Sequence, residues 1–295
     1  MIRALTSIAA SNASSISIEE LFLLLPLGVF GSTAELHAFL EGDRALEGQV
    51  VIDRDQVTLW GSEELARDRI AQIELTAQRL QLAKSFSEQL MKACPWIRLA
   101  AISGSTAYAT SRPQDDIDFF LVTRGKRLWV TLLIAMILAR FRRLKNPTSP
   151  QLCFNRISEE RECREEFRSV RDPLFAREAL NLRVLAGQSH YRDLLSVAPW
   201  MGDVFPRLYS RLAVRDRSIQ TNEVTFTARR HWWIANAIAF AILAPYLMMV
   251  GSVRNHRLLR HGAEQARFQT ILRRGFFAYE SNKYELLRDR YSKVF

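Results

Sequence analysis

Apolar residues near the start of the chain follow helical spacing and then change to short alternating runs. The segment Ser17-Ile18-Glu19-Glu20 has the spacing of a capping box, and an apolar helix is predicted from it to Phe30. After Gly31-Ser32, the pattern predicts a second short helix and then two short strands around a polar turn. Helices followed by a two-stranded ribbon are typical of a winged-helix-like module, which we place at residues 1–61.

Winged-helix modules often bind DNA, but the charges here favour another role. The second predicted helix, residues 33–41, contains neither Lys nor Arg that could contact phosphate. We therefore favour a packing or interaction role for residues 1–61. A nucleic-acid-binding regulator that acts through this module stays an alternative function of the chain.

The remaining pattern divides into three parts. A long helix of mixed apolar and charged residues is predicted over 62–94 and connects the first module to the rest of the chain. Short apolar runs that alternate with helical spacing predict an α/β core at 95–171. Residues 172–295 show mostly helical spacing and are predicted to form a helical C-terminal region.

Residues 232–250 form a nineteen-residue segment in which only Asn236 and Pro245 are not apolar. Basic clusters flank it on both sides, so its length and flanks permit a transmembrane helix. Its alanine content and the internal proline favour instead a buried or interfacial helix. Membrane association through this segment is therefore left open.

The amino-acid composition indicates where the protein is located and what kinds of partner it binds. The chain has 295 residues, of which 48% are hydrophobic and 24% charged, as in ordinary globular proteins. The formal net charge of +10 favours anionic partners such as nucleotides, nucleic acid or an anionic membrane. The three cysteines fit neither a zinc motif nor a disulfide framework, and the first fifteen residues lack a signal-peptide pattern. We therefore expect a cytoplasmic protein, with membrane association as the open alternative.

The positive charge is concentrated after one acidic segment. Residues 119–158 contain no Asp or Glu and eight Lys or Arg, so an anion bound beside the preceding Asp116 and Asp118 would lie in a positive field. A solvated basic surface is the other interpretation. The eight residues are Arg124, Lys126, Arg127, Arg140, Arg142, Arg143, Lys145 and Arg156.

Candidate chemistry is concentrated in Gly104-Ser105 and Asp116-Ile117-Asp118. Each pair lies at the boundary of a predicted strand. Side chains alternate across a strand, so Asp116 and Asp118 are expected to point the same way while Ile117 enters the core. Two adjacent carboxylates repel unless a cation lies between them, and Mg²⁺ prefers such oxygen ligands and shares them with phosphates. The pattern therefore predicts a Mg²⁺ site that holds a nucleoside triphosphate.

These two motifs resemble the signature of the nucleotidyltransferase superfamily typified by DNA polymerase beta. The chain is also similar to bacterial and archaeal nucleotidyltransferase-domain proteins with an N-terminal winged-helix-like part. The resemblance implies an α/β (α+β) fold with a mixed sheet in a polymerase-beta-type core, preceded by that module and followed by helices. It implies that Asp116 and Asp118 are catalytic metal ligands and that Gly104 and Ser105 contact phosphate. Arg112 and Lys126 are the candidates for offsetting its charge.

One departure from the family pattern concerns the third carboxylate that active members carry on a neighbouring strand. The predicted strand offers Asn155 at this place, which cannot act as a base and is a weaker metal ligand. Glu159 and Glu160 lie just beyond it and are the candidates to substitute. Without a third acid, the site could bind a nucleotide and turn it over slowly.

The predicted function is Mg²⁺-dependent transfer of a nucleoside monophosphate from an NTP, with ATP as the expected donor, to a hydroxyl group. A catalytically weak nucleotide sensor on the same fold is the alternative that Asn155 suggests. RNA, a protein hydroxyl and a small molecule all stay open as acceptors. Base preference and oligomeric state are not encoded in any pattern that we find.

Overall fold

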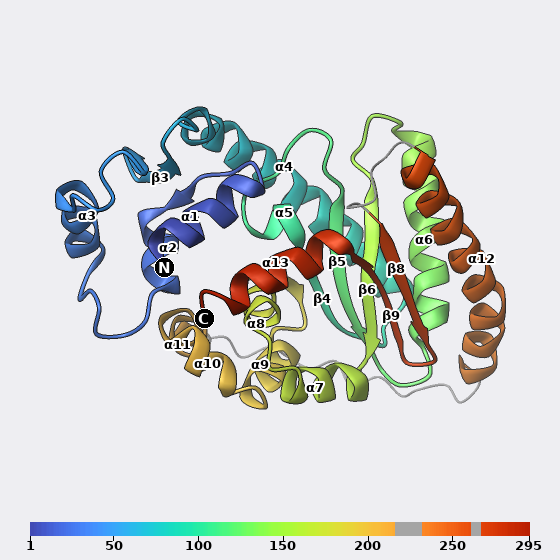
Figure 1. Cartoon of the computed structure of the whole chain (residues 1–295). Coiled ribbons are helices and arrows are strands. Elements are labelled where there is room, and N and C mark those ends of the chain that lie inside the picture. Colours follow the sequence, from blue (N-terminus) through green and yellow to red (C-terminus); the bar gives the residue numbers. More distant parts are fainter. Residues whose placement is uncertain (216–231, 261–266) are drawn as a thin grey trace.

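The computed structural model describes residues 1–215, 232–260 and 267–295, which form a mixed α/β structure (Figure 1). Its main sheet has the strand order β7-β4-β5-β6-β9-β8. Only β5 and β6 pair in parallel, and the other neighbours in this described sheet are antiparallel. The strands are β4 (Ile97–Ser103), β5 (Ile117–Thr123), β6 (Leu152–Glu159), β7 (Arg183–Ala186), β8 (Phe268–Arg273) and β9 (Phe276–Ser281). The predicted mixed sheet is confirmed.

The apolar runs of β4 and β5 supply both faces of this sheet. Leu99 and Phe120 belong to one buried cluster, whereas Ala100 and Phe119 belong to the other, as alternation along a strand requires. The second cluster is closed by α4 (Glu64–Ala93), α6 (Leu128–Lys145) and α12 (Trp232–Arg260). The first is closed by α7 (Glu160–Ser169), α8 (Pro173–Leu180), α9 (Gln188–Ser196), α10 (Trp200–Val204), α11 (Pro206–Arg215) and α13 (Asn282–Ser292).

The N-terminal module contains the predicted helices and ribbon. Its elements are α1 (Ile2–Ser11), β1 (Ile16–Ser17), α2 (Ile18–Leu24), α3 (Thr33–Gly42), β2 (Val50–Asp53) and β3 (Gln56–Leu59), with sheet order β1-β3-β2. The capping box of Ser17 and Glu20 is present, but α2 ends at Leu24 rather than Phe30. Pro26 explains the early end, because the residue before a proline is disfavoured in a helix.

The module is packed into the rest of the protein. Leu21 of α2 and Leu36 of α3 are fully buried in the same apolar cluster as Phe167 of α7. Arg207 of α11 also donates hydrogen bonds to the backbone oxygens of Leu25 and Pro26. These contacts support a packing role for residues 1–61.

The predicted helical C-terminal region is wrong in one respect, because residues 172–295 also supply three strands of the main sheet. β7 pairs with β4 at one edge, and the β8–β9 hairpin adds to β6 at the other. β7 is only four residues long, and β8 has no fully buried residue, so neither shows a strong strand pattern. Their pairing depends on partners far away in sequence.

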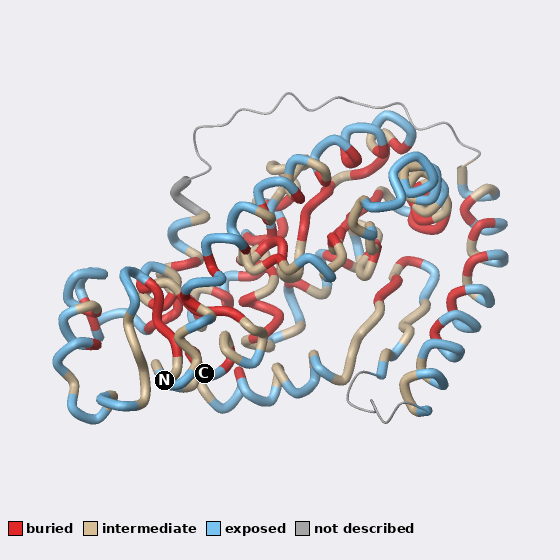
Figure 2. The backbone as a smooth tube through the Cα atoms, turned by 90° about the horizontal axis from the view of Figure 1, so that it is seen from above, coloured by how far each residue is buried: buried red, intermediate tan, exposed pale blue. Residues whose placement is uncertain are grey.

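Helix α12 contains the long apolar segment at 232–250. One side of it is buried against α6 and β8, through residues that include Asn236, Ala239, Leu243 and Leu247, whereas its other side is exposed (Figure 2). Asn236 Oδ1 accepts hydrogen bonds from the backbone N–H groups of Trp129 and Val130, at 2.7 and 3.2 Å, which fixes α12 to the start of α6. By length and composition α12 could cross a membrane, and the basic cluster at 229–231 lies outside the described residues.

Candidate functional site

The structure brings the Gly-Ser turn and the acidic strand together. β4 ends at Ser103, which lies opposite Asp118 of β5, and the short helix α5 (Gly104–Ala107) begins at the next residue. Gly104 has φ +62°, and a Cβ atom at this position would lie 2.3 Å from Asp118 Oδ2. Only glycine allows this conformation and this contact at once. The local sequence therefore fixes the carboxylate of Asp118 against the turn.

A cavity of about 540 Å³ opens at this point. It is lined by Gly104, Ser105, Asp116 and Asp118, so all four of these predicted site residues face one space. Its apolar wall includes Leu5 and Ile8 from α1 and Leu174 from α8. This volume is in the range of pockets that hold small-molecule ligands.

The two aspartates lie in an environment that disfavours their charged forms. Burial raises the pKa of Asp118 to about 7, and the neighbouring charge of Asp116 adds to the shift. Burial also raises the pKa of Asp116, against the opposing effects of Arg254 and Arg79. A divalent cation between the two carboxylates would relieve both effects, because it favours their ionised forms.

Asn155 occupies the neighbouring-strand position. Its Nδ2 donates a hydrogen bond of 2.5 Å to Asp118 Oδ1, and it lines the same cavity. The parallel register places Asp118 opposite Cys153 and Thr123 opposite Glu159. Asn155 therefore takes the place at which the family resemblance implies a third acid.

Glu159 and Glu160 are placed at the wrong end of the sheet to substitute for that acid. Thr123 lies five positions after Asp118, which corresponds to about 17 Å along an extended strand. Glu159 lies at this far end, where it accepts hydrogen bonds from the backbone of the turn before α6. Glu160 Oε1 forms an ion pair of 2.7 Å with Arg98. Both glutamates are excluded as ligands beside Asp118.

Of the two basic residues predicted to contact phosphate, one lies at the cavity and the other does not. Arg112 lines the cavity and forms an ion pair of 3.2 Å with Asp115. Lys126 is exposed in the turn after β5, beyond Thr123, and does not line the cavity. The structure therefore does not bring Lys126 to the site.

Two basic residues from the end of the chain line the cavity instead. Arg254 lies on α12, 4.1 Å above the ring of Phe268, and Lys283 lies in the first turn of α13. Burial lowers the pKa of Lys283, and the charge of Arg112 lowers it further. Neither was predicted from the sequence, because the β8–β9 hairpin and α12 bring them to the site from more than 130 residues away.

A second acidic group, Glu178 of α8, also lines the cavity. Its Oε1 accepts a hydrogen bond of 2.9 Å from the hydroxyl of Tyr108, and its own pKa is raised by burial. The guanidinium of Arg177 lies 4.9 Å from the centre of the Tyr108 ring. Glu178 belongs to an ordinary amphipathic helix, so no local pattern signals its position in the site.

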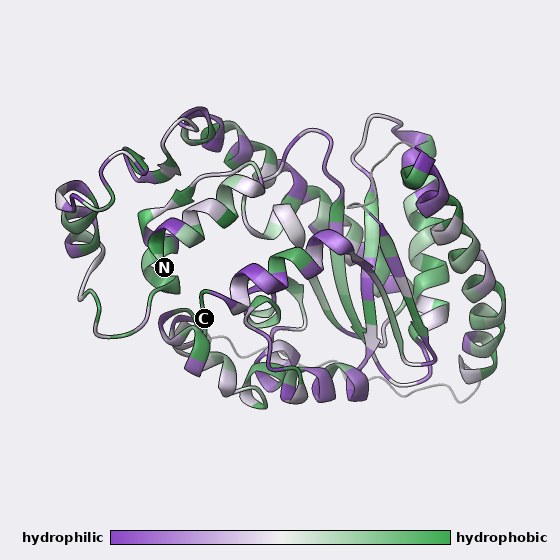
Figure 3. Ribbon diagram, viewed as in Figure 1, coloured by the Kyte–Doolittle hydropathy of each residue, from purple (hydrophilic) through white to green (hydrophobic). Residues whose placement is uncertain are grey.

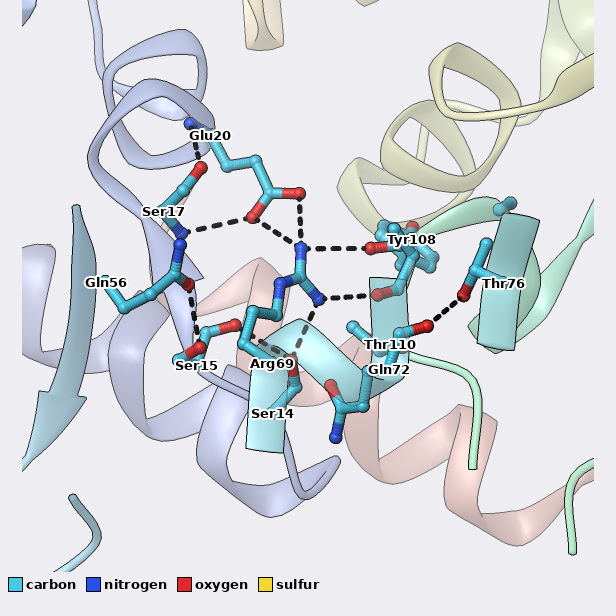
Figure 4. Close-up of polar contacts among 12 residues, drawn as sticks. Ser14, Ser15, Ser17, Glu20, Gln56, Arg69, Gln72, Thr76, Tyr108 and Thr110 are labelled. Carbon is cyan, nitrogen blue, oxygen red and sulfur yellow. Dashed lines mark hydrogen bonds and ion pairs between the residues drawn. The ribbon is translucent and has the colours of Figure 1, made fainter. Parts of the chain in front are cut away.

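The loop after α5 is held by two arginines of α4. The side chain of Arg69, which is only 4% exposed, donates hydrogen bonds to the backbone oxygens of Tyr108 and Ala109 and to Ser14, and pairs with Glu20 (Figure 4). Arg79 Nη2 donates to the backbone oxygens of Arg112 and Pro113, which line or adjoin the cavity. Helix α4 thus positions both the loop and the N-terminal module around the site.

The donor set at the cavity fits a cation that completes its coordination with water and substrate. In the part of the chain that the structure describes, no group of three or more His, Cys, Asp or Glu side chains is placed to hold a metal ion by itself. Mg²⁺ is usually bound by one or two carboxylates together with substrate phosphates and waters. Asp116 and Asp118 can supply the two carboxylates.

Comparison with known proteins identifies no relative: no family model, curated protein or solved structure matches this chain. Its function is therefore inferred from the geometry of the cavity and from the resemblance of its motifs.

Proposed function

We propose that this protein is a Mg²⁺-dependent nucleotidyltransferase with a polymerase-beta-type core. The observation that carries the proposal is the contact of Asp118 with Gly104, at a cavity that also holds Asp116, Ser105 and several basic side chains. A phosphate-binding turn beside paired carboxylates is the arrangement that the motif resemblance implies. The donor is an NTP, with ATP as the first to test.

Each residue has a physical role in this proposal. Gly104 lets phosphate approach the backbone, and Ser105 offers its hydroxyl and N–H groups to phosphate oxygens. Asp116 and Asp118 hold the metal, which when bound supplies charge stabilisation for the phosphates. Arg112, which also lines the cavity, faces the same anionic group.

The reaction is an in-line displacement at the α-phosphorus. The oxygen of the acceptor hydroxyl forms a bond to phosphorus and passes its proton to water. The bond between the α-phosphorus and the pyrophosphate oxygen breaks, and its electron pair stays on the departing pyrophosphate. Positive side chains near that leaving group favour its departure, because they stabilise the charge that develops on it. Arg254 and Lys283 are the cavity residues available for this role.

The test is pyrophosphate release from labelled NTPs in the presence of Mg²⁺ and a panel of RNA, protein and small-molecule acceptors. The double variant Asp116→Ala plus Asp118→Ala should abolish release. Asp53→Ala plus Asp55→Ala is the matched control, because these two aspartates have the same spacing in an exposed turn of the N-terminal module. Release that is unchanged in the first double variant would end the proposal.

Asn155 favours a second candidate function, a nucleotide sensor with little turnover. Its amide binds Asp118 where a third carboxylate would orient the attacking hydroxyl. A sensor binds ATP and Mg²⁺ at millimolar or tighter concentration without pyrophosphate release. Calorimetry together with the release assay separates the two functions.

A further inference from the structure

The outer faces of α12 and α6 expose an unusual amount of apolar side chain. On α12, Ile238, Ile242 and Met249 are 56%, 57% and 58% exposed, and on α6, Phe141 and Leu144 are 60% and 62% exposed. Isolated exposed apolar residues are common, but a face of this kind on two packed helices indicates an interaction surface. We call it the α6–α12 face, with Ile137, Phe141, Leu144, Ile234, Ile238, Ile242, Met248, Met249 and Val253 as its members.

Basic residues gather at one end of the α6–α12 face. The starts of the two helices meet where Asn236 binds the backbone of Trp129. Their ends both approach the acidic turn. Arg254 of α12 lines the same cavity as Asp116, and Arg143 of α6 donates a hydrogen bond of 3.0 Å to the side chain of Gln151, whose backbone oxygen accepts from the N–H of Ile117. Figure 3 shows hydrophobic residues along both helices and hydrophilic residues at these ends. The exposed cations there are Arg140, Arg143, Lys145, Arg254, Arg257 and Arg260.

We propose that the α6–α12 face docks onto an anionic lipid bilayer, with α12 lying in the plane of the interface. An apolar helical face beside Lys and Arg is the pattern of helices that insert between headgroups and acyl chains. The described part of α12 carries no acidic residue, and the last turn of α6 carries none either, so neither helix itself repels negative lipid headgroups at the basic end.

The contacts of α12 favour this orientation over a membrane span. A spanning helix would be surrounded by lipid, whereas Asn236, Ala239 and Leu243 are buried against the protein. A second copy of the chain on this face is the other occupant to test, but its α6 and α12 carry no acidic residue that could pair with the exposed cations. The charge therefore favours lipid over self-association.

The experiment is sedimentation of the full chain with vesicles of phosphatidylcholine alone or mixed equally with phosphatidylglycerol. We expect binding to the anionic vesicles and at least tenfold weaker binding to the neutral ones, with further loss as NaCl is raised. Failure to sediment with the anionic vesicles overturns the proposal.

Two pairs of variants locate the contact. Ile238→Asp plus Ile242→Asp should reduce vesicle affinity at least tenfold, because charge is placed where apolar side chains enter the interface. Ile70→Asp plus Ile73→Asp is the matched control, since these residues are also exposed but lie on α4. It should leave affinity unchanged, and equal loss in both double variants contradicts the assignment.

Charge reversal tests the basic end. Arg257→Glu plus Arg260→Glu should lower affinity for anionic vesicles about 25-fold or more, at about fivefold for each lost cation. Arg161→Glu plus Arg164→Glu has the same spacing on α7 and should have little effect. Circular dichroism confirms that each variant is folded.

Two further results would overturn the proposal in favour of another occupant. Light scattering that shows a lipid-free dimer, dissociated by Ile238→Asp plus Ile242→Asp, assigns the face to a second copy. Protein that stays with vesicles after alkaline carbonate extraction spans the bilayer rather than docking on it. These outcomes do not depend on pyrophosphate release, so this proposal and the proposed enzyme activity can fail separately.

Discussion

Replacing Gly104 by alanine perturbs the contact on which the site depends. The left-handed backbone at φ +62° costs an alanine about 1–2 kcal/mol. The added Cβ would also lie 2.3 Å from Asp118 Oδ2, so the carboxylate must move by roughly 1 Å to reach an ordinary contact distance. A displacement of that size at a reacting centre lowers the rate about 100-fold. We therefore expect Gly104→Ala to fold, with modestly lower stability, and to lose about 99% of pyrophosphate release.

Gly28→Ala separates the loss of stability caused by the positive φ from the loss of activity caused by displacing the carboxylate of Asp118. Gly28 also has a positive φ, +82°, but an added Cβ would meet nothing within 4 Å. Urea unfolding should therefore show a similar loss of about 1–2 kcal/mol in this variant, while pyrophosphate release stays at the wild-type rate. If Gly104→Ala loses no more activity than Gly28→Ala, the steric role of Gly104 beside Asp118 is refuted.

Four further predictions concern the same region. The pKa of Asp118 in the folded protein, about 7, lies above its ordinary value of 3.8, so the folded state becomes less stable as pH rises between these values. In thermal unfolding without metal, Asp118→Asn should therefore raise the melting temperature at pH 8 and change it little at pH 4. For the same reason wild-type affinity for Mg²⁺ should fall up to about tenfold per pH unit below about 7. Asn155→Asp should strengthen Mg²⁺ binding at least tenfold and lower the melting temperature in EDTA, since it adds a carboxylate beside Asp118. Arg69→Ala should cost about 3 kcal/mol in urea unfolding, because it removes a buried cation from Glu20 and two backbone oxygens.

The residues that could be predicted from the sequence are those whose placement depends on local pattern. Gly104 and Asp118 each lie at the end of an apolar strand, so their positions follow from strand alternation once the two strands pair. The capping box at Ser17 is local in the same way. Such short-range rules need no knowledge of distant partners.

The residues that were missed reach the site through long-range pairing. Arg254 arrives with α12, and Lys283 arrives with α13 after the β8–β9 hairpin, whose strands show little alternation of buried and exposed residues. The error over Glu159 has another cause, because a helix that crosses between two strands implies that they are parallel. A parallel β6 puts its last residues at the far end from Asp118, so the order of elements in the sequence already excludes Glu159.

Calorimetric titration of ATP tests most directly whether Asp116 and Asp118 bind triphosphate through a divalent cation. We predict that ATP binds the wild-type chain in Mg²⁺ and at least tenfold more weakly in EDTA, and that Asp118→Asn shows the weak binding under both conditions. Equal ATP affinity in Mg²⁺ and EDTA, with no change in Asp118→Asn, would contradict this mode of binding.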